Sequence, residues 1–189
     1  MNSPSRFELY QRNLSLLLRI YPQYRSLFEN GIPYSTRFEI QPFGPQSYTC
    51  SMKTGPCPED SPGQPEIRWL HGPGDPWIWA EDRVREAGLD THRTFVTVRP
   101  GLGYLPFRLY PQLRKGRHAQ RLLLVEDRID LFRLALQLFD WTDLLRSDRV
   151  ILLLTDDPVS AVTQFFSINP VAILPPLRVQ TGIVESGEE

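Results

Sequence analysis

Three short runs of aliphatic and β-branched residues, separated by helical patterns, constrain the fold of this 189-residue chain more than any other feature. They span residues 94–98, 121–125 and 150–154, and the second has almost no polar face. Strands that are apolar on both faces belong in a parallel sheet that helices cover on both sides. The pattern therefore predicts an α/β fold.

The segments beside these runs have helical spacing. Residues 104–113 and 129–138 place apolar side chains three and four positions apart, and Asp157-Pro158 is a cap followed by proline at the first helical position. Parallel neighbours need crossover connections, which are nearly always right-handed. We therefore expect a three-layer Rossmann-like (methyltransferase-like) parallel half-sheet, with residues 171–174 as a candidate fourth strand.

The rest of the sequence is less regular. Ser5 can cap a helix that runs toward Tyr21, and Pro22 can open a second short helix. Residues 36–40 and 48–52 alternate polar and apolar side chains, which indicates a loose β-hairpin. The predicted organisation is an N-terminal helix and hairpin region (1–74), a Rossmann-like domain (75–175) and a polar tail (176–189).

The charge balance excludes some classes of partner. The chain has 21 Lys and Arg against 22 Asp and Glu, whereas nucleic-acid and membrane-surface binders need clustered cations. The sequence contains no run of 18 apolar residues, so it predicts no membrane span. Its polar first residues do not resemble a secretory signal. Cys50 and Cys57 are too few for a disulfide scaffold. We expect a cytoplasmic globular protein with neither nucleic acid nor membrane as partner.

A glycine turn follows the first predicted strand. Gly101 and Gly103 allow a sharp turn, and the helix that begins near Tyr104 would offer free N–H groups to a cofactor phosphate or carboxylate. Pro106 stands where a full dinucleotide fingerprint has its third glycine, so the motif is incomplete. The alternative is a tight turn that only packs the helix on the strand.

An acidic residue ends the second predicted strand. Glu126 lies 23 residues after Gly103, near the spacing at which dinucleotide-binding folds place a carboxylate for ribose hydroxyls. Folds that bind S-adenosylmethionine use an acidic residue in the same place. Glu126 is the better candidate, since Asp127 can cap the next helix. The sequence predicts S-adenosylmethionine or a nucleotide as the possible cofactor.

Two further positions have competing interpretations. Asp156 follows the third predicted strand, where a residue would face an adenine-like base, while Asp157 is better read as a helix cap. His71 and Asp75 are flanked by glycines and could suggest a metal or catalytic pair, but no second His lies at ligand spacing. A turn leading into a capped helix is the favoured interpretation, and no metal site is predicted.

Motifs of common enzyme sites are missing. The sequence contains no G-x-S-x-G elbow, no G-x-x-x-x-G-K-[ST] phosphate loop and no H-E-x-x-H pair. We therefore assign no catalytic residue, and we expect the tryptophans to be core anchors.

Several of these residues resemble one family. The run HGPGDP from His71 to Pro76, the run FVTVRPGLGY from Phe95 to Tyr104 and the segment DWTDLL at 140–145 look like the N-terminal domain of motility-associated-factor (Maf) glycosyltransferase-like proteins. The likeness covers about residues 10–158. It departs from the family at Arg99-Pro100, where the resemblance would imply a small residue or glycine.

The resemblance implies a role in protein glycosylation. In the family, this domain precedes a central domain related to the 6-hydroxymethylpterin diphosphokinase MptE-like domain, which is thought to transfer nonulosonic acid to flagellin. The present sequence has no such second domain, so it could be a separate chain or part of a longer one. A transferase domain or a flagellin-like protein would then be its partner.

Three hypotheses follow. The chain is a non-catalytic recognition or docking module of the Maf type, a small S-adenosylmethionine- or nucleotide-binding enzyme, or a structural subunit whose glycine turn binds nothing. Only the second uses Gly101, Gly103, Tyr104, Glu126 and Asp156 as ligand contacts.

Overall fold

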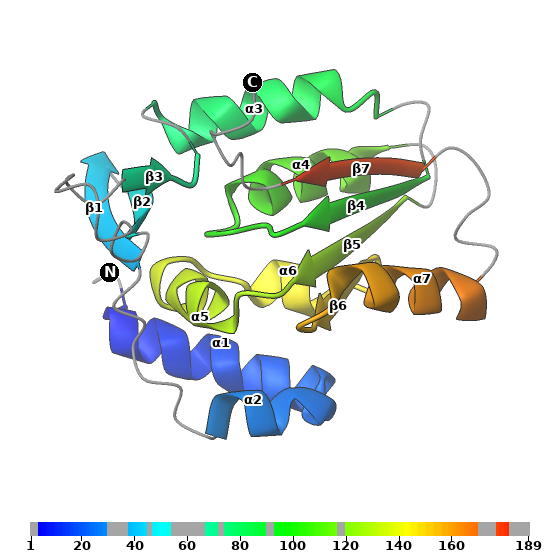
Figure 1. Ribbon diagram of the computed structural model, residues 1–189, viewed down its shortest axis with the longest axis horizontal. Coiled ribbons are helices and arrows are strands. Elements are labelled where there is room, and N and C mark those ends of the chain that lie inside the picture. Colours follow the sequence, from blue (N-terminus) through cyan, green and yellow to red (C-terminus); the bar gives the residue numbers. More distant parts are fainter. Residues whose placement is uncertain are drawn as a thin grey trace, which may run out of the picture.

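The protein has a mixed α/β fold with one parallel and one antiparallel sheet (Figure 1). The computed structural model describes residues 4–29, 38–44, 47–53, 67–71, 74–89, 93–116, 120–169 and 177–181. Its elements are α1 (Arg6–Ile20), the 3-10 helix η1 (Pro22–Tyr24), α2 (Arg25–Glu29), β1 (Phe38–Gly44), β2 (Ser47–Lys53), β3 (Ile67–Trp69), α3 (Pro76–Glu86), β4 (Thr94–Val98), α4 (Tyr104–Lys115), β5 (Arg121–Glu126), α5 (Ile129–Leu138), α6 (Thr142–Arg146), β6 (Val150–Leu154), α7 (Pro158–Ile168) and β7 (Leu177–Thr181).

The parallel sheet has the strand order β6-β5-β4-β7. Strands β4, β5 and β6 form at the three predicted runs, and they are parallel neighbours in one layer. Val96 of β4 is opposite Leu123 of β5, which is opposite Ile151 of β6. The prediction of a parallel sheet from these runs is confirmed.

The fourth strand differs from the prediction. It is β7, which pairs in parallel with β4 on the side away from β5. It lies inside residues 176–189, for which the sequence predicts a polar tail, whereas the candidate strand at 171–174 lies outside the described residues. The sequence of β7, LRVQT, alternates apolar and polar residues, which is a strand signal that the prediction of a polar tail did not take into account.

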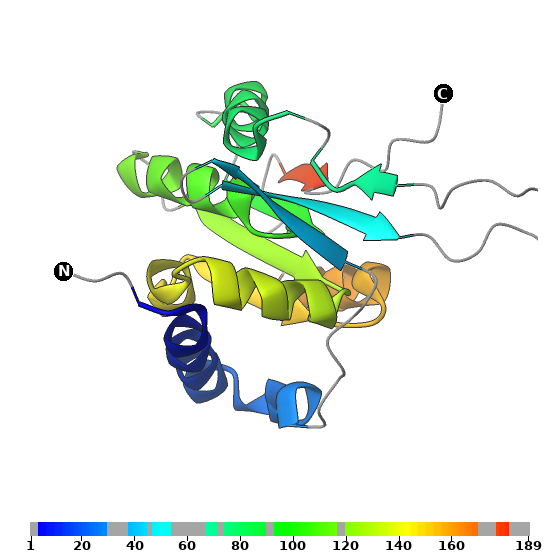
Figure 2. The ribbon, with the colours of Figure 1, turned by 90° about the vertical axis from the view of Figure 1, so that its left-hand side faces the viewer.

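Helices cover the two faces of the sheet differently. Leu122 and Leu124 of β5 point into the large core, which includes apolar residues of α4, α5 and α1. Leu123 and Val125 point to the other face, where they pack with Phe166 of α7. Figures 1 and 2 show α7 on one side of the sheet and α4 and α5 on the other. The alternation of side chains along β5 thus produces three layers.

The N-terminal region shares the large core. Helix α1 begins with a complete capping box, in which the Ser5 side chain accepts from Glu8 N–H and Glu8 accepts from Ser5 N–H. This confirms Ser5 as the helix cap. Leu16 and Leu17 of α1 are buried in the core that also holds the leucines of β5.

A buried amide joins α1 to the end of α5. Asn13 Nδ2 donates to the carbonyl oxygens of Leu136 and Phe139, at 2.8 and 2.7 Å, and its Oδ1 accepts from Trp141 N–H at 3.1 Å. The Trp141 ring N–H donates to Ala135 O. Asn13 therefore satisfies backbone groups that the end of a helix leaves open.

Two tyrosines complete the outer edge of β6. The Tyr21 hydroxyl accepts from Leu152 N–H and donates to Val150 O, at 3.3 and 3.4 Å. The Tyr24 hydroxyl accepts from Leu154 N–H and donates to Leu152 O, at 3.2 and 3.0 Å. These hydroxyls hydrogen-bond the edge as a fifth strand would, which protects it from pairing with another chain.

The antiparallel sheet has the order β1-β2-β3. The predicted hairpin is confirmed, with Ile40 opposite Cys50. Its first strand, β1, continues past the predicted end at Ile40 to Gly44, and residues 36–37 of the predicted strand lie outside the described residues. Figure 2, which looks from the left-hand side of Figure 1, shows this small sheet in front of the ends of the parallel strands. It therefore lies beside the edge at which a ligand was predicted.

Candidate functional site

The predicted ligand residues lie at the carboxyl edge of the parallel sheet. Strand β4 stands between β5 and β7, so the chain adds strands first on one side of β4 and then on the other. Open α/β sheets bind ligands outside the carboxyl ends of their strands where the strand order reverses in this way. The turn from Arg99 to Gly103 lies at this point.

The turn has an unusual backbone. Gly101 and Gly103 have φ of 62° and 100°, and Arg99 has φ of 53° without being glycine. The N–H of Arg99 donates to Val125 O at 2.7 Å, and the N–H of Gly103 donates to Pro100 O at 3.0 Å. These bonds close the turn onto the end of β5, and the glycines take backbone conformations that other residues rarely adopt.

Gly103 serves the packing of the core. A Cβ atom at this position would lie 2.6 Å from Cζ2 of Trp141 and 3.0 Å from a ring atom of Phe107. The Trp141 side chain is fully buried. The position that a side chain at residue 103 would take is therefore occupied by the indole ring of Trp141, from the loop before α6.

Tyr104 faces the small sheet. Its side chain is fully buried. Its hydroxyl donates to Tyr48 O and accepts from Tyr48 N–H, both at 2.7 Å. Burial raises the pKa of the Tyr104 hydroxyl above its ordinary value. The two bonds hold the start of β2 to the start of α4.

Glu126 is buried beneath the same turn. Its carboxylate accepts from Gly101 N–H at 3.2 Å and from Arg128 N–H at 2.9 Å, and the residue is 0% exposed. Burial raises the pKa of Glu126 from its ordinary 4.5 to about 8. The structure thus brings Gly101 and Glu126 together, and it joins each carboxylate oxygen to backbone of the protein itself.

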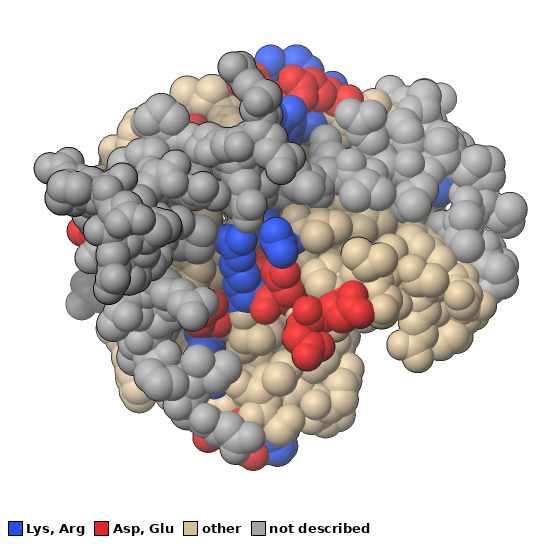
Figure 3. Space-filling model, in the orientation of Figure 1, with Lys and Arg blue, Asp and Glu red and all other residues tan. Residues whose placement is uncertain are grey.

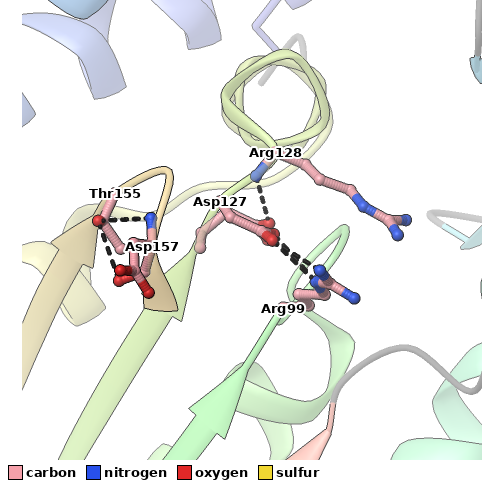
Figure 4. A network of polar contacts seen from close by, with 6 residues as sticks. Arg99, Asp127, Arg128, Thr155 and Asp157 are labelled. Atoms are coloured by element: carbon pink, nitrogen blue, oxygen red, sulfur yellow. Dashed lines mark hydrogen bonds and ion pairs between the residues drawn. The ribbon is translucent and has the colours of Figure 1, made fainter. Parts of the chain in front are cut away.

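A second layer of polar groups lies nearer the surface. Arg99 Nε donates to both carboxylate oxygens of Asp127, at 3.1 and 3.0 Å, and Arg99 Nη2 donates to Oδ2 at 2.8 Å. The Arg99 side chain is 39% exposed and that of Asp127 is 13% exposed. Figure 4 shows this pair at the ends of β4 and β5, and Figure 3 shows basic and acidic groups meeting on the corresponding face. Asp127 thus binds Arg99 and does not cap α5, whose N-cap residue is Arg128.

The loop after β6 contributes Asp156 and Asp157. Asp157 caps α7 by accepting from Ser160 N–H at 3.1 Å, as predicted, and the hydrogen bonds from Ser160 hold the pKa of Asp157 below its ordinary value. Thr155 Oγ1 accepts from Asp157 N–H, and Thr155 N–H donates to Glu126 O. Asp156 is exposed, so among the predicted ligand residues it alone faces solvent.

His71 belongs to an aromatic cluster. Its ring lies 5.1 Å from Trp79 and 5.2 Å from Tyr104, and burial lowers the pKa of His71 to about 4. Asp75 caps α3 by accepting from Trp77 N–H, as expected for a turn leading into a helix. In the ranges that the structure describes, no three His, Cys, Asp or Glu residues are grouped so that they could hold a metal ion.

Sequence reasoning missed the partners of the predicted residues. Trp141 contacts Gly103 from 38 positions along the chain, and Tyr48 binds Tyr104 from 56 positions away. Neither partner forms a local motif with its target. The one sequence signal that this turn is packed by the protein itself was Arg99, a large residue beside the two glycines of the turn.

Comparisons with other proteins give no family. No family model matches the chain, and no curated protein is similar to it. Separately, none of the helices that the structure describes combines the length and apolar character needed to cross a membrane.

Proposed function

We propose that this chain is a non-catalytic recognition or docking module built on a Rossmann-like half-sheet. Numbered along the chain, the strands of the parallel sheet lie in the order 3-2-1-4, which is the order of the first four strands of a doubly wound sheet. The observation that carries the proposal is that the glycine turn is filled by the protein's own groups.

A cosubstrate would have to displace those groups. Glu126 would exchange its bonds from Gly101 and Arg128 for ribose hydroxyls, and it would do so from a fully buried position. A phosphate or carboxylate on the side of Gly103 where a Cβ would lie would meet the Trp141 ring. A buried polar group that loses its hydrogen-bond partner costs free energy. The contacts at this edge therefore support a structural turn and argue against a cofactor site.

The resemblance to the Maf N-terminal domain supplies the biological setting. In this proposal the module acts in the cytoplasm in a protein-glycosylation system that transfers nonulosonic acid to flagellin. Its partner is the transferase domain or a flagellin-like protein, and the chain itself supplies no catalytic group.

Calorimetric titration tests the proposal. We expect no saturable heat with S-adenosylmethionine, S-adenosylhomocysteine or a CMP-activated sugar, and a saturable signal with a purified Maf-type transferase domain or with flagellin. Saturable binding of an adenosyl ligand that is lost in Glu126→Ala would contradict the proposal, as would the absence of binding to both proteins.

The alternative function is a small S-adenosylmethionine- or nucleotide-binding enzyme. The reversal of strand order at β4 and the surface groups of Arg99, Asp127 and Asp156 favour it. Under this alternative, Asp156→Ala and Asp127→Asn would weaken adenosyl-ligand binding without unfolding the protein.

A further inference from the structure

A polar hollow lies at the amino-terminal edge of the parallel sheet, opposite the glycine turn. Its volume is about 470 Å³, and it is lined by Tyr110, Arg114, Asp143, Arg146, Ser147, Asp148 and Arg149. The backbone fixes its position, because Arg149 O accepts from Leu122 N–H at the start of β5, and Val150 begins β6. The hollow is therefore at the other end of the strands from the glycine turn.

The arginines of the hollow have no carboxylate partner in the described part of the chain. Arg149 Nη1 donates to the carbonyl oxygen of Leu113 at 3.2 Å, and the Arg114 guanidinium lies 5.8 Å from the centre of the Tyr110 ring. Arg146 is exposed at the end of α6. Three guanidinium groups thus line one cavity, and the described ion pairs involve none of them.

The two carboxylates of the hollow form no described ion pair with the three arginines, and they leave its lining with a formal charge of +1. Asp143 and Arg146 stand three positions apart on α6, a spacing that allows an ion pair, yet the described residues form none there. Asp148 lies in the loop that leads to β6 and likewise forms no described ion pair. The donors of the arginines are therefore available to a ligand.

One of the three arginines is held in position. The bond to Leu113 O holds one end of the Arg149 guanidinium, and Arg149 N–H donates to Ser147 Oγ at 3.1 Å. Arg114 is exposed, and its guanidinium lies over the Tyr110 ring. Donors that are already ordered lose less entropy when a ligand binds.

We propose that this hollow binds a small molecule that carries phosphate groups. One carboxylate is satisfied by a single guanidinium fork, whereas a diphosphate has enough oxygens for three. The volume is within the roughly 300–1,000 Å³ of small-molecule sites. The ligand would contact Arg146 and Arg149 first, with Arg114 as the third donor, and Asp143 would limit its affinity by repulsion.

Calorimetry on the full chain at low ionic strength tests this site, with sodium pyrophosphate as the probe and citrate as an anion without phosphate. We expect one saturable pyrophosphate site that weakens as salt is added, and weaker binding of citrate. Arg146→Gln should raise the pyrophosphate Kd roughly 10- to 100-fold, and Asp143→Asn should lower it.

Matched variants separate a site from general charge attraction. Arg85→Gln on α3 makes the same charge change at an exposed position outside the hollow, and it should leave the pyrophosphate Kd unchanged. Arg146 is exposed and has no described partner, so Arg146→Gln should melt at the wild-type temperature. No saturable binding, an equal loss in Arg85→Gln and Arg146→Gln, or citrate binding as tightly as pyrophosphate would overturn the proposal.

Discussion

The two edges of the parallel sheet use charged residues in opposite ways. At the carboxyl edge, Glu126 and Asp127 are bound to backbone and to Arg99 of the same chain. At the amino edge, Arg114 and Arg146 line a cavity and form no described ion pair. The carboxyl edge, which carries the glycine motif, is packed by the protein's own groups. The amino edge carries no such motif, and its arginines have hydrogen-bond donors that no described carboxylate binds. A ligand motif is therefore informative only when its polar groups are left unsatisfied by the fold.

The interior of the sheet, between the two edges, should give the largest loss of stability. Leu123 of β5 is 1% exposed and Leu152 of β6 is 2% exposed, so replacing either with alanine leaves a cavity. We expect each Leu→Ala variant to lose about 2–5 kcal/mol of unfolding free energy in urea denaturation. Losses under about 1 kcal/mol at both positions would contradict a sheet covered on both faces.

The glycine turn should be the most sensitive point of the carboxyl edge. Gly103→Ala places a methyl group against Trp141 at a backbone φ of 100°, so overpacking and backbone strain add. We expect a loss of about 2–4 kcal/mol in urea denaturation. Gly74→Ala is the matched control, because a Cβ there meets no atom within 4 Å. Equal stability of the two variants would contradict the contrast between the two edges, since it would mean that Trp141 does not fill the space beside Gly103.

Glu126 should make stability depend on pH. Its pKa in the folded protein is raised from 4.5 to about 8, so the folded state binds more protons than the unfolded state between these values. The contribution of Glu126 to stability is therefore greatest below about pH 4.5, falls as pH rises toward 8, and is then constant. The size of this effect is on the order of a few kcal/mol. Thermal melts from pH 5 to 8.5 should show wild type losing stability relative to Glu126→Gln as pH rises, and a difference between the two that does not change with pH would refute a buried carboxyl.

The surface ion pair of the carboxyl edge should contribute less to the unfolding free energy than the glycine turn does. Asp127→Asn removes the charge that Arg99 binds, but the Arg99 side chain is partly exposed and water can solvate it. We expect a loss of about 0.5–1 kcal/mol that shrinks in high salt. A loss above that of Gly103→Ala would show that the surface pair, and not the buried turn, holds this edge.

The amino edge should give the smallest change in stability. Arg146→Gln removes an exposed cation with no described partner, so its unfolding free energy should stay within about 0.5 kcal/mol of wild type. Adding pyrophosphate should raise the melting temperature of wild type but not that of the variant. A clear destabilisation without ligand would mean that Arg146 stabilises the fold, and the contrast between the edges would fail.

Local sequence was sufficient for most elements of the fold. The cap at Ser5, the Asp-Pro pairs that begin α3 and α7, and the aliphatic runs of β4, β5 and β6 are each encoded within a few neighbouring residues. Such signals depend on backbone geometry and hydrogen bonds of short range. The strand β7 was missed because a short alternating run beside a charged segment is a weak signal.

The candidate site was predicted only in part. The adjacency of Gly101 and Glu126 followed from parallel pairing of β4 and β5, since residues at the carboxyl ends of neighbouring strands come together. Whether Glu126 faced a ligand or the interior depended on Arg128, Trp141 and the small sheet, which pack around the turn. No spacing rule reports such packing.

The sequence by itself determined most of the segments that become strands and helices, with β7 as the exception, because hydrophobic periodicity and caps act over a few residues. Only the tertiary structure decided which polar groups are satisfied. Trp141 and Tyr48 meet the glycine turn from distant parts of the chain, and the arginines around the amino-edge hollow form no described ion pair. Satisfaction of a polar group depends on all atoms within hydrogen-bonding distance, and those atoms are brought together by folding and not by order along the chain.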